Sequence, residues 1–184
     1  MTDHKKHSLC FSGHRPEKLP AGGDENAPVT KVLKSLLYQK ITDSIEKGYT
    51  RFYIGGARGV DMWAGEMLME QKSLGKNIEI IVVLPYEGFN NSFKGCDKWT
   101  FGRLIYRADK IVTLSAKYYN GCMLRRNEYM VEHSSALIAV LCDPKSGTGH
   151  TINTARRKGL AVDIINAADI AAAMEKSAGE YEVL

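Results

Sequence analysis

The chain has 184 residues, of which 44% are hydrophobic and 25% are charged, a composition typical of one soluble globular domain. The 25 Lys and Arg residues exceed the 21 Asp and Glu residues, and the resulting net charge of +4 is too small to require a nucleic-acid partner. No apolar run approaches the roughly 20 residues of a membrane helix. Residues 1–7 are polar and lack the apolar segment of a signal peptide, so we expect a cytoplasmic protein.

Strand-like and helix-like segments alternate along the chain. Short apolar runs predict strands at 8–12, 51–54, 77–84, 111–114, 136–141 and 162–165. Apolar side chains at helical spacing predict helices at 28–46, 60–74, 99–108, 124–133, 151–158 and 168–176. This order predicts an α/β fold, a single doubly wound Rossmann-like domain at 8–176 with a mainly parallel sheet and helices on both faces. We expect a flexible N-terminus at 1–7 and a frayed tail at 177–184.

A glycine-rich turn, Gly-Gly-Ala-Arg-Gly-Val-Asp at 55–61, joins the predicted strand 51–54 to the predicted helix 60–74. Backbone N–H groups at the start of a helix lack intrahelical partners and lie at the positive end of the helix dipole, so they favour phosphate or carboxylate. The alternative is a tight turn whose glycines only permit close packing.

Ligands of open parallel sheets bind beyond the carboxyl ends of the strands, near the point where strand order reverses. Five predicted loops fall there, and each carries residues suited to a nucleotide. These loops are 12–15, 55–61, 85–88, 115–119 and 143–151. The candidate ligand-binding residues are Ser12, Gly13, His14, Arg15, Gly55, Gly56, Ala57, Gly59, Asp61, Pro85, Tyr86, Ser115, Arg126, Asn127, Ser146, Gly147 and Thr148.

We assign these candidates distinct roles. Phosphate is expected at Gly55, Gly56, Gly59, Ser146, Gly147 and Thr148. Arg15 would neutralise its charge, Asp61 would accept a ribose hydroxyl, and Tyr86 would stack on a base.

Each of these roles has a purely structural alternative. Arg15 would instead pair with a loop carboxylate, Asp61 would only complement the helix dipole, and His14 would be exposed and idle. Tyr86 would be a packing residue, and Arg125 would lie on a solvated helix face.

Common nucleotide and metal motifs are absent. The segment 143–151 is not a P-loop, because that motif requires Gly at position 144, where this chain has Pro144, and Lys at position 150, where it has His150. No GxGxxG follows a strand, because Ile152 stands where a third glycine would follow Gly147 and Gly149. No HExxH or CxxC motif is present, so we expect no metal site.

Four motifs in this order resemble the SLOG superfamily, and within it the bacterial YpsA/YoqJ-like branch. They lie at 13–16, 55–61, 126–131 and 146–148, and the resemblance runs from about residue 9 to residue 159. It implies a Rossmann-like fold and a nucleotide-like ligand, with some members acting as sensors. Relatives include the LOG phosphoribohydrolases, DprA, which binds single-stranded DNA, and dimeric proteins that make a homodimer plausible by analogy.

The leading hypothesis is a sensor or regulatory module that binds a nucleotide or a nucleotide-derived small molecule, such as ADP-ribose or a dinucleotide, with no other cofactor certain. The LOG pattern Pro-Gly-Gly-x-Gly-Thr-x-x-Glu ends in a catalytic glutamate that segment 145–152 lacks. An N-glycosidase acting on nucleoside monophosphates would therefore depend on Asp61 or His14.

DprA-like binding of single-stranded DNA is a second alternative. Aromatic and basic residues coincide only near Tyr118, Tyr119, Arg125 and Arg126, so a nucleic-acid partner is not expected.

Overall fold

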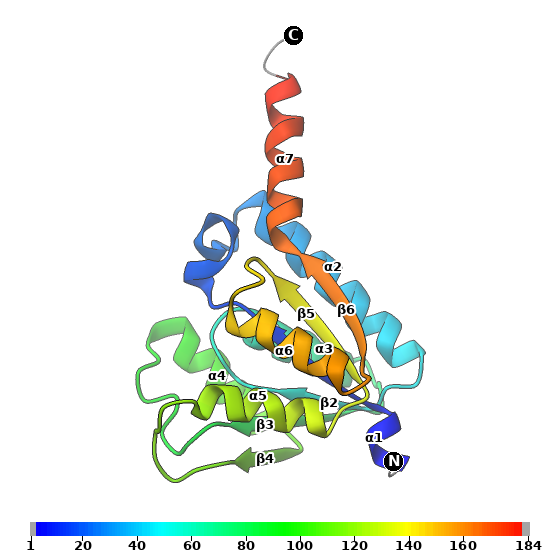
Figure 1. Ribbon diagram of the computed structural model, residues 1–184, viewed down its shortest axis with the longest axis vertical. Coiled ribbons are helices and arrows are strands. Elements are labelled where there is room, and N and C mark those ends of the chain that lie inside the picture. Colours follow the sequence, from blue (N-terminus) through cyan, green and yellow to red (C-terminus); the bar gives the residue numbers. More distant parts are fainter. Residues whose placement is uncertain (1–2, 182–184) are drawn as a thin grey trace.

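Six parallel strands form one sheet in the order β4-β3-β2-β1-β5-β6 (Figure 1). The computed structural model describes residues 3–181. The strands are β1 (Ser8–Gly13), β2 (Arg51–Ile54), β3 (Glu79–Leu84), β4 (Lys110–Thr113), β5 (Ala136–Leu141) and β6 (Ala161–Asn166). Every described pairing is parallel, which confirms the predicted α/β fold.

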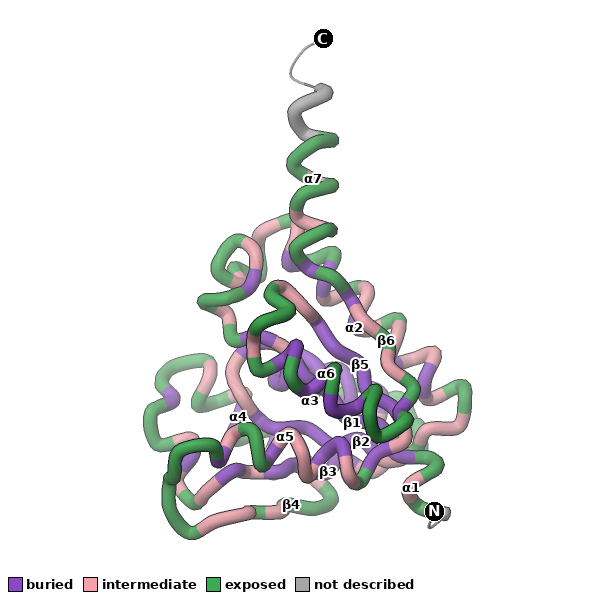
Figure 2. Tube along the Cα trace, viewed as in Figure 1, coloured by how far each residue is buried: buried purple, intermediate pink, exposed green. Residues whose placement is uncertain are grey.

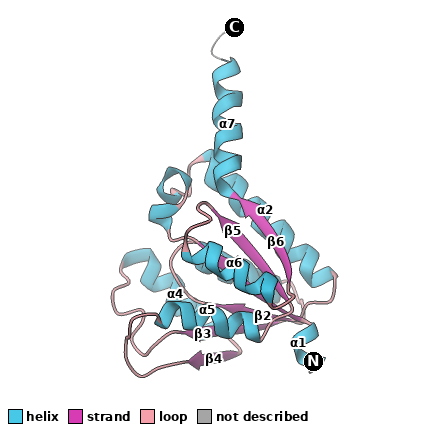
Figure 3. Cartoon of the chain, in the orientation of Figure 1, coloured by secondary structure: helices cyan, strands magenta, loops and turns pink. Residues whose placement is uncertain are grey.

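Helices cover both faces of this sheet (Figure 3). The α-helices are α1 (Asp3–Lys6), α2 (Pro28–Glu46), α3 (Val60–Ser73), α4 (Gly95–Arg107), α5 (Cys122–Glu132), α6 (Gly147–Arg157) and α7 (Ala167–Tyr181), and two 3-10 turns, η1 (Pro16–Lys18) and η2 (Pro20–Gly23), follow β1. Apolar side chains of α2, α3 and α4 pack on one face, and those of α5 and α6 pack on the other.

The alternating side chains of the central strands supply both cores. In β1, Leu9 and Phe11 join the core under α2 and α3, whereas Cys10 joins the core under α5 and α6. Figure 2 shows this burial along the inner strands. The edge strand β4 is mostly exposed. A sheet buried on both faces explains why strands such as β3 are almost continuously apolar.

The ends of several elements differ from the prediction. The segment 3–6, expected to be flexible, forms a helical turn, and Ser8 Oγ donates to the His4 carbonyl at 2.6 Å. At the other end α7 continues past residue 176 to Tyr181 and projects from the body in Figure 1. The remaining parts of the two predicted terminal segments, 1–2 and 182–184, lie outside the described residues.

No helix between residues 3 and 181 combines the length and the apolar character that crossing a membrane requires.

Candidate functional site

A polar cavity of about 230 Å³ lies at the carboxyl ends of the central strands. It opens where β1 pairs with β2 on one side and with β5 on the other. Successive strands proceed from β1 toward β4, and the chain then crosses back to β5, so this is the point where strand order reverses. The lining residues are Phe11, Ser12, Gly13, His14, Arg15, Lys18, Ala57, Asp61, Met123, Arg126, Asn127, Ser146, Gly147 and Thr148.

The structure therefore brings together most of the candidates from the sequence. Those that line the cavity are Ser12, Gly13, His14, Arg15, Ala57, Asp61, Arg126, Asn127, Ser146, Gly147 and Thr148. Those outside its lining are Gly55, Gly56, Gly59, Pro85, Tyr86 and Ser115. Three lining residues were not predicted, namely Phe11, Lys18 and Met123. Of these, only Lys18 could have been recognised from the sequence, because it is a cation three residues after Arg15.

The first turn of α6 forms one wall of the cavity. We predicted this helix to begin at residue 151, but it begins at Gly147, because Ser146 acts as its N-cap and its Oγ accepts from the Gly149 amide at 3.3 Å. The amides of Gly147 and Thr148 belong to the first turn, where an α-helix offers no intrahelical acceptor. This wall therefore presents backbone donors at the positive end of a helix dipole.

Two cations border the same cavity. Arg15 follows β1 and Lys18 ends η1, and both are exposed. Within residues 3–181, neither side chain forms an ion pair with a carboxylate. Their charge is therefore available to an anion held at the α6 amides.

Arg58 holds in place the segment that carries these cations. Its Nη1 donates to Glu17 Oε1 at 2.6 Å, between Arg15 and Lys18 in the chain, and its Nε donates to Asp97 Oδ2 of α4 at 2.7 Å. This pair of contacts ties the loop after β1 to the turn after β2 and to α4. The segment between β1 and α2 is thus ordered at its start, where η1 lies.

His14 is buried, although the alternative considered above left it exposed and idle. Only 5% of the residue is accessible, and its Nε2 is buried with no hydrogen-bond partner in the described chain. Burial and the nearby Lys18 lower the pKa of His14, while Asp143 opposes this shift. A buried ring nitrogen without a partner costs free energy, so His14 is the residue of the cavity lining whose hydrogen bonding is incomplete within the described chain.

Asp61 and Arg126 form a buried charged pair in the cavity wall. Arg126 Nη1 lies 3.6 Å from Asp61 Oδ2, which also accepts from the Ala57 amide at 3.1 Å. Burial raises the pKa of Asp61, against the opposing effects of Arg126 and the Ala57 amide. Both contacts use Oδ2, so Oδ1 keeps no hydrogen bond to the described part of the chain and can accept a ligand hydroxyl.

Arg126 also links the two helices that line the cavity. Its Nε donates to Asn127 Oδ1 at 2.8 Å, and Asn127 Nδ2 donates to Thr151 Oγ1 at 3.0 Å. Thr151 Oγ1 in turn donates to the Gly147 carbonyl at 2.9 Å. The start of α5 is thereby fixed against the start of α6.

The predicted phosphate-binding glycines of the turn after β2 have other surroundings. The Gly55 carbonyl accepts from Arg126 Nη1, and a Cβ at Gly55 would lie 2.6 Å from Asp61 Oδ2. Gly59 has φ +83°, and its Cβ would lie 2.5 Å from the His14 carbonyl oxygen. A Cβ at Gly56 would lie 3.1 Å from Phe101, on the α4 side. These glycines allow the cavity walls to approach one another.

The loops after β3 and β4 lie outside the cavity lining. Tyr86 packs edge-on against Phe89 and Tyr118, with ring centroids 5.8 and 5.5 Å away. Ser115 Oγ donates to the Lys117 carbonyl at 2.7 Å. Tyr86 therefore matches its packing alternative, and its predicted role in base stacking has no support from the cavity.

Removing the cap of α6 tests how this wall is held. We expect Ser146→Ala to lower the free energy of unfolding by about 1 kcal/mol, because the Gly149 amide loses its acceptor. Urea unfolding followed by circular dichroism measures the change. Ser177→Ala, in α7, serves as the matched control, and an equal loss in both variants would contradict the role of the cap.

This fold and cavity define a Rossmann-like α/β protein with a polar site at the reversal point of its parallel sheet. The YpsA family model, described as the YspA SLOG family, matches residues 9–169, and the chain belongs to that family. Relatives include a UPF0398 protein of Bacillus cereus, 24% identical over 82% of this chain and 83% of its own, and one of Halalkalibacterium halodurans, 25% identical over 76% and 75%.

Two solved structures share the fold. DNA processing protein A from Helicobacter pylori, described for its single-stranded DNA binding mode, has a TM-score of 0.59 and 18% identity over 96% of this chain and 74% of its own. DNA processing protein A (DprA) from Streptococcus pneumoniae has a TM-score of 0.59 and 15% identity over 94% of this chain and 57% of its own. We expected no nucleic-acid partner, and these two structures do not support that expectation.

Proposed function

We propose that this protein binds a nucleotide-derived small molecule, with a phosphate of the ligand at the start of α6. The observation that carries the proposal is one cavity lined by Gly147 and Thr148 of the first turn of α6, by the cations Arg15 and Lys18, and by His14, whose buried Nε2 has no partner in the described chain. Amides, cations and an imidazole are the groups that proteins use to hold a phosphate.

The opposite wall suits the sugar and base. Asp61 Oδ1 would accept a ribose hydroxyl, as its position beside the glycine turn suggested. Phe11 and Met123 add apolar surface to the lining, and they would contact the base in place of Tyr86. The nucleotide would therefore lie across the ends of β1, α5 and α6.

Replacing Arg15 tests the proposal directly. We expect Arg15→Ala to weaken binding of ADP-ribose, NAD or nucleoside phosphates by about 10- to 100-fold, because a hydrogen bond to a charged group is lost. Isothermal titration calorimetry of the full chain measures the affinity, after a thermal-shift screen has selected the ligand.

The matched control is Arg156→Ala, an exposed arginine in the last turn of α6. Unchanged affinity in Arg15→Ala, or an equal loss in both variants, would contradict the assignment. Chromatography of the same mixtures tests the N-glycosidase hypothesis, since release of free base that Asp61→Asn abolishes would show turnover instead of binding alone.

Single-stranded DNA is a second candidate ligand, favoured by the fold shared with two DNA processing proteins. A backbone phosphate of the strand would occupy the same position at α6, and the strand would leave the cavity past Tyr118 and Arg125, which are exposed near the start of α5. This candidate requires Arg15→Ala and Tyr118→Ala both to weaken DNA binding.

A further inference from the structure

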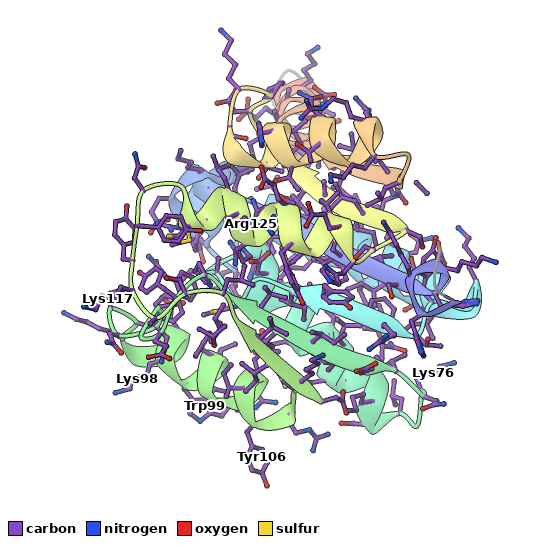
Figure 4. All side chains as sticks on the ribbon, turned by 60° about the horizontal axis from the view of Figure 1, so that its bottom comes forward. Lys76, Lys98, Trp99, Tyr106, Lys117 and Arg125 are labelled. Atoms are coloured by element: carbon purple, nitrogen blue, oxygen red, sulfur yellow. The ribbon has the colours of Figure 1, made fainter. Side chains whose placement is uncertain are left out.

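Helix α4 has an outer surface that the cavity does not use. Its inner side is buried, with Phe101 and Leu104 in the cores beneath it. Its outer side carries Trp99, which is 63% exposed, and Tyr106, which is 86% exposed. Figure 4 shows both side chains along the outer side of α4, with Tyr106 pointing away from the body of the protein.

Basic side chains share this surface, which we call the α4 face and define as Lys98, Trp99, Arg103, Tyr106 and Arg107. Trp99, Arg103, Tyr106 and Arg107 follow one another at intervals of four, three and one residues, so they form one stripe along the helix. The Arg103 guanidinium lies 4.6 Å from the centroid of the Trp99 ring. Arg107 Nη2 donates to Ser73 Oγ at 3.2 Å.

The charge of the face is positive. No carboxylate among residues 3–181 forms an ion pair with Lys98, Arg103 or Arg107, and the exposed Lys94 and Lys110 lie beyond the two ends of α4. Glu66 and Glu70 of α3 border the groove that Arg103, Tyr106 and Arg107 also line. Asp97 and Asp109, the carboxylates of the stretch 94–110, pair with Arg58 and Lys72, so the five cations of that stretch outnumber the two carboxylates of the groove.

We propose that the α4 face binds a single-stranded nucleic acid. Such binding combines cations that follow the phosphate backbone with exposed aromatic rings on which bases stack, and the α4 face presents both in one stripe. Trp99 and Tyr106 are separated by about 10 Å along the helix axis, a span that a few nucleotides of one strand cover. Two bases of one strand can therefore stack on the two rings while the arginines between and beside them hold phosphates.

The charge of the face disfavours a second copy of the chain as its occupant. A two-fold contact places the same surface on both subunits, so the cluster of Lys98, Arg103 and Arg107 on one copy would face the same cluster on the other. Like charges brought together in this way oppose association, whereas a polyanion neutralises them and releases its counterions.

The α4 face and the cavity are separate sites, since no α4 residue lines the cavity. The inference therefore goes beyond the proposed function and does not depend on it. It also differs from the second candidate above, in which the strand passes through the cavity and along Tyr118.

Fluorescence anisotropy with labelled oligodeoxythymidine of about 20 nucleotides tests the proposal on the full chain. We expect Trp99→Ala to weaken binding by about tenfold, because one base loses its stacking partner. The double variant Arg103→Ala/Arg107→Ala should also weaken it and should reduce the dependence of log affinity on log salt by about 1.4. All of these side chains are exposed, and thermal melting verifies that the variants remain folded.

Matched variants separate the α4 face from other basic and aromatic surfaces. Tyr118→Ala removes a ring that is 65% exposed, close to the exposure of Trp99, and Arg156→Ala/Arg157→Ala removes two exposed arginines from α6. We expect Arg156→Ala/Arg157→Ala to bind the oligonucleotide like the wild type, whereas Tyr118→Ala and Arg15→Ala report whether the strand lies in the cavity instead. An oligouridine of equal length distinguishes RNA from DNA, and inorganic polyphosphate tests whether the bases matter.

Three results would overturn the proposal. The first is an affinity that Trp99→Ala leaves unchanged, and the second is equal affinity for polyphosphate and the oligonucleotide. The third is a dimer in light scattering that Trp99→Ala dissociates, which would assign the face to a second copy. Loss of oligonucleotide binding in Tyr118→Ala and Arg15→Ala, with Trp99→Ala unaffected, would instead place the strand in the cavity.

Discussion

Replacement of Arg126 by methionine should lower the free energy of unfolding by about 3–5 kcal/mol at neutral pH. Arg126 lies 3.6 Å from Asp61, and both side chains are at most 7% exposed. The substitution keeps an apolar stem but leaves a buried carboxylate without its counter-charge and the Gly55 carbonyl without its donor. Urea unfolding of both proteins measures the difference.

The pH dependence of this loss identifies its cause. Burial already raises the pKa of Asp61, and removal of Arg126 should raise it further. A carboxyl whose pKa is raised on folding binds more protons in the folded state, so its contribution to stability is greatest at low pH and declines as pH rises through that folded pKa. The loss in Arg126→Met should therefore shrink as pH falls toward about 4, the ordinary carboxyl range.

The double variant Asp61→Asn/Arg126→Met provides the control. It removes the unpaired charge, so it should be more stable than Arg126→Met alone at neutral pH. A loss that stays constant between neutral and acid pH, and that Asp61→Asn does not relieve, would show that packing and not charge is the cause.

Gly59→Ala should lower the free energy of unfolding by about 2–5 kcal/mol and abolish ligand binding in the cavity. Gly59 has φ +83°, and the added Cβ would lie 2.5 Å from the His14 carbonyl oxygen and 3.2 Å from the Arg15 Cα. The backbone of the segment after β1 would have to move, which displaces the His14 and Arg15 side chains from the cavity. Thermal unfolding and calorimetry measure the two effects.

Gly75→Ala gives the cost of a positive φ without this collision, whereas Gly59 also has ψ −126°, which lies outside the left-handed region. Gly75 has φ +84°, nearly the same as Gly59, but nothing lies within 4 Å of its added Cβ. We expect a loss of only about 1–2 kcal/mol and unchanged ligand binding. Similar losses of unfolding free energy in both variants would show that the close approach of the two loops does not affect stability.

The fold was predictable because its inner strands are buried on both faces. Runs such as Ile80–Val83 carry enough apolar side chains to be recognised as strands without any partner being known. Helix starts were less predictable, because Gly147, Thr148 and Gly149 are poor helix formers and disguise the first turn of α6. The hydrogen bond of Ser146 Oγ to the Gly149 amide compensates for that weak propensity, and it exists only in the folded helix.

The cavity was partly predictable for a topological reason. A loop after a central parallel strand lies at the carboxyl edge wherever the sheet is formed, so His14, Asp61 and Ser146 could be grouped in advance. The pairing of Arg126 with Gly55 and Asp61 could not, because it joins the start of α5 to a turn far away in the chain. Tyr86 follows a strand as expected, but packing against Phe89 and Tyr118 takes its ring away from the cavity.

The α4 face could not be predicted from aromatic and basic residues that are adjacent in the chain. Trp99, Arg103 and Tyr106 are apart in the sequence and become neighbours only on a helix. Trp99 is also the type of residue expected in a core, and only the packing of Phe101 and Leu104 shows which side of α4 is outward.

Because β1 lies in the middle of the sheet, the two halves of the sheet can form only one after the other during translation. The strands β2, β3 and β4 follow β1 in sequence, and β2 pairs with β1, β3 with β2 and β4 with β3, so this half of the sheet can form strand by strand as the chain leaves the ribosome. The other edge of β1 has no partner until Ala136 arrives opposite Leu9. A nascent chain of intermediate length therefore exposes an unpaired edge at the middle of its future sheet, where chaperones or other chains can add to it.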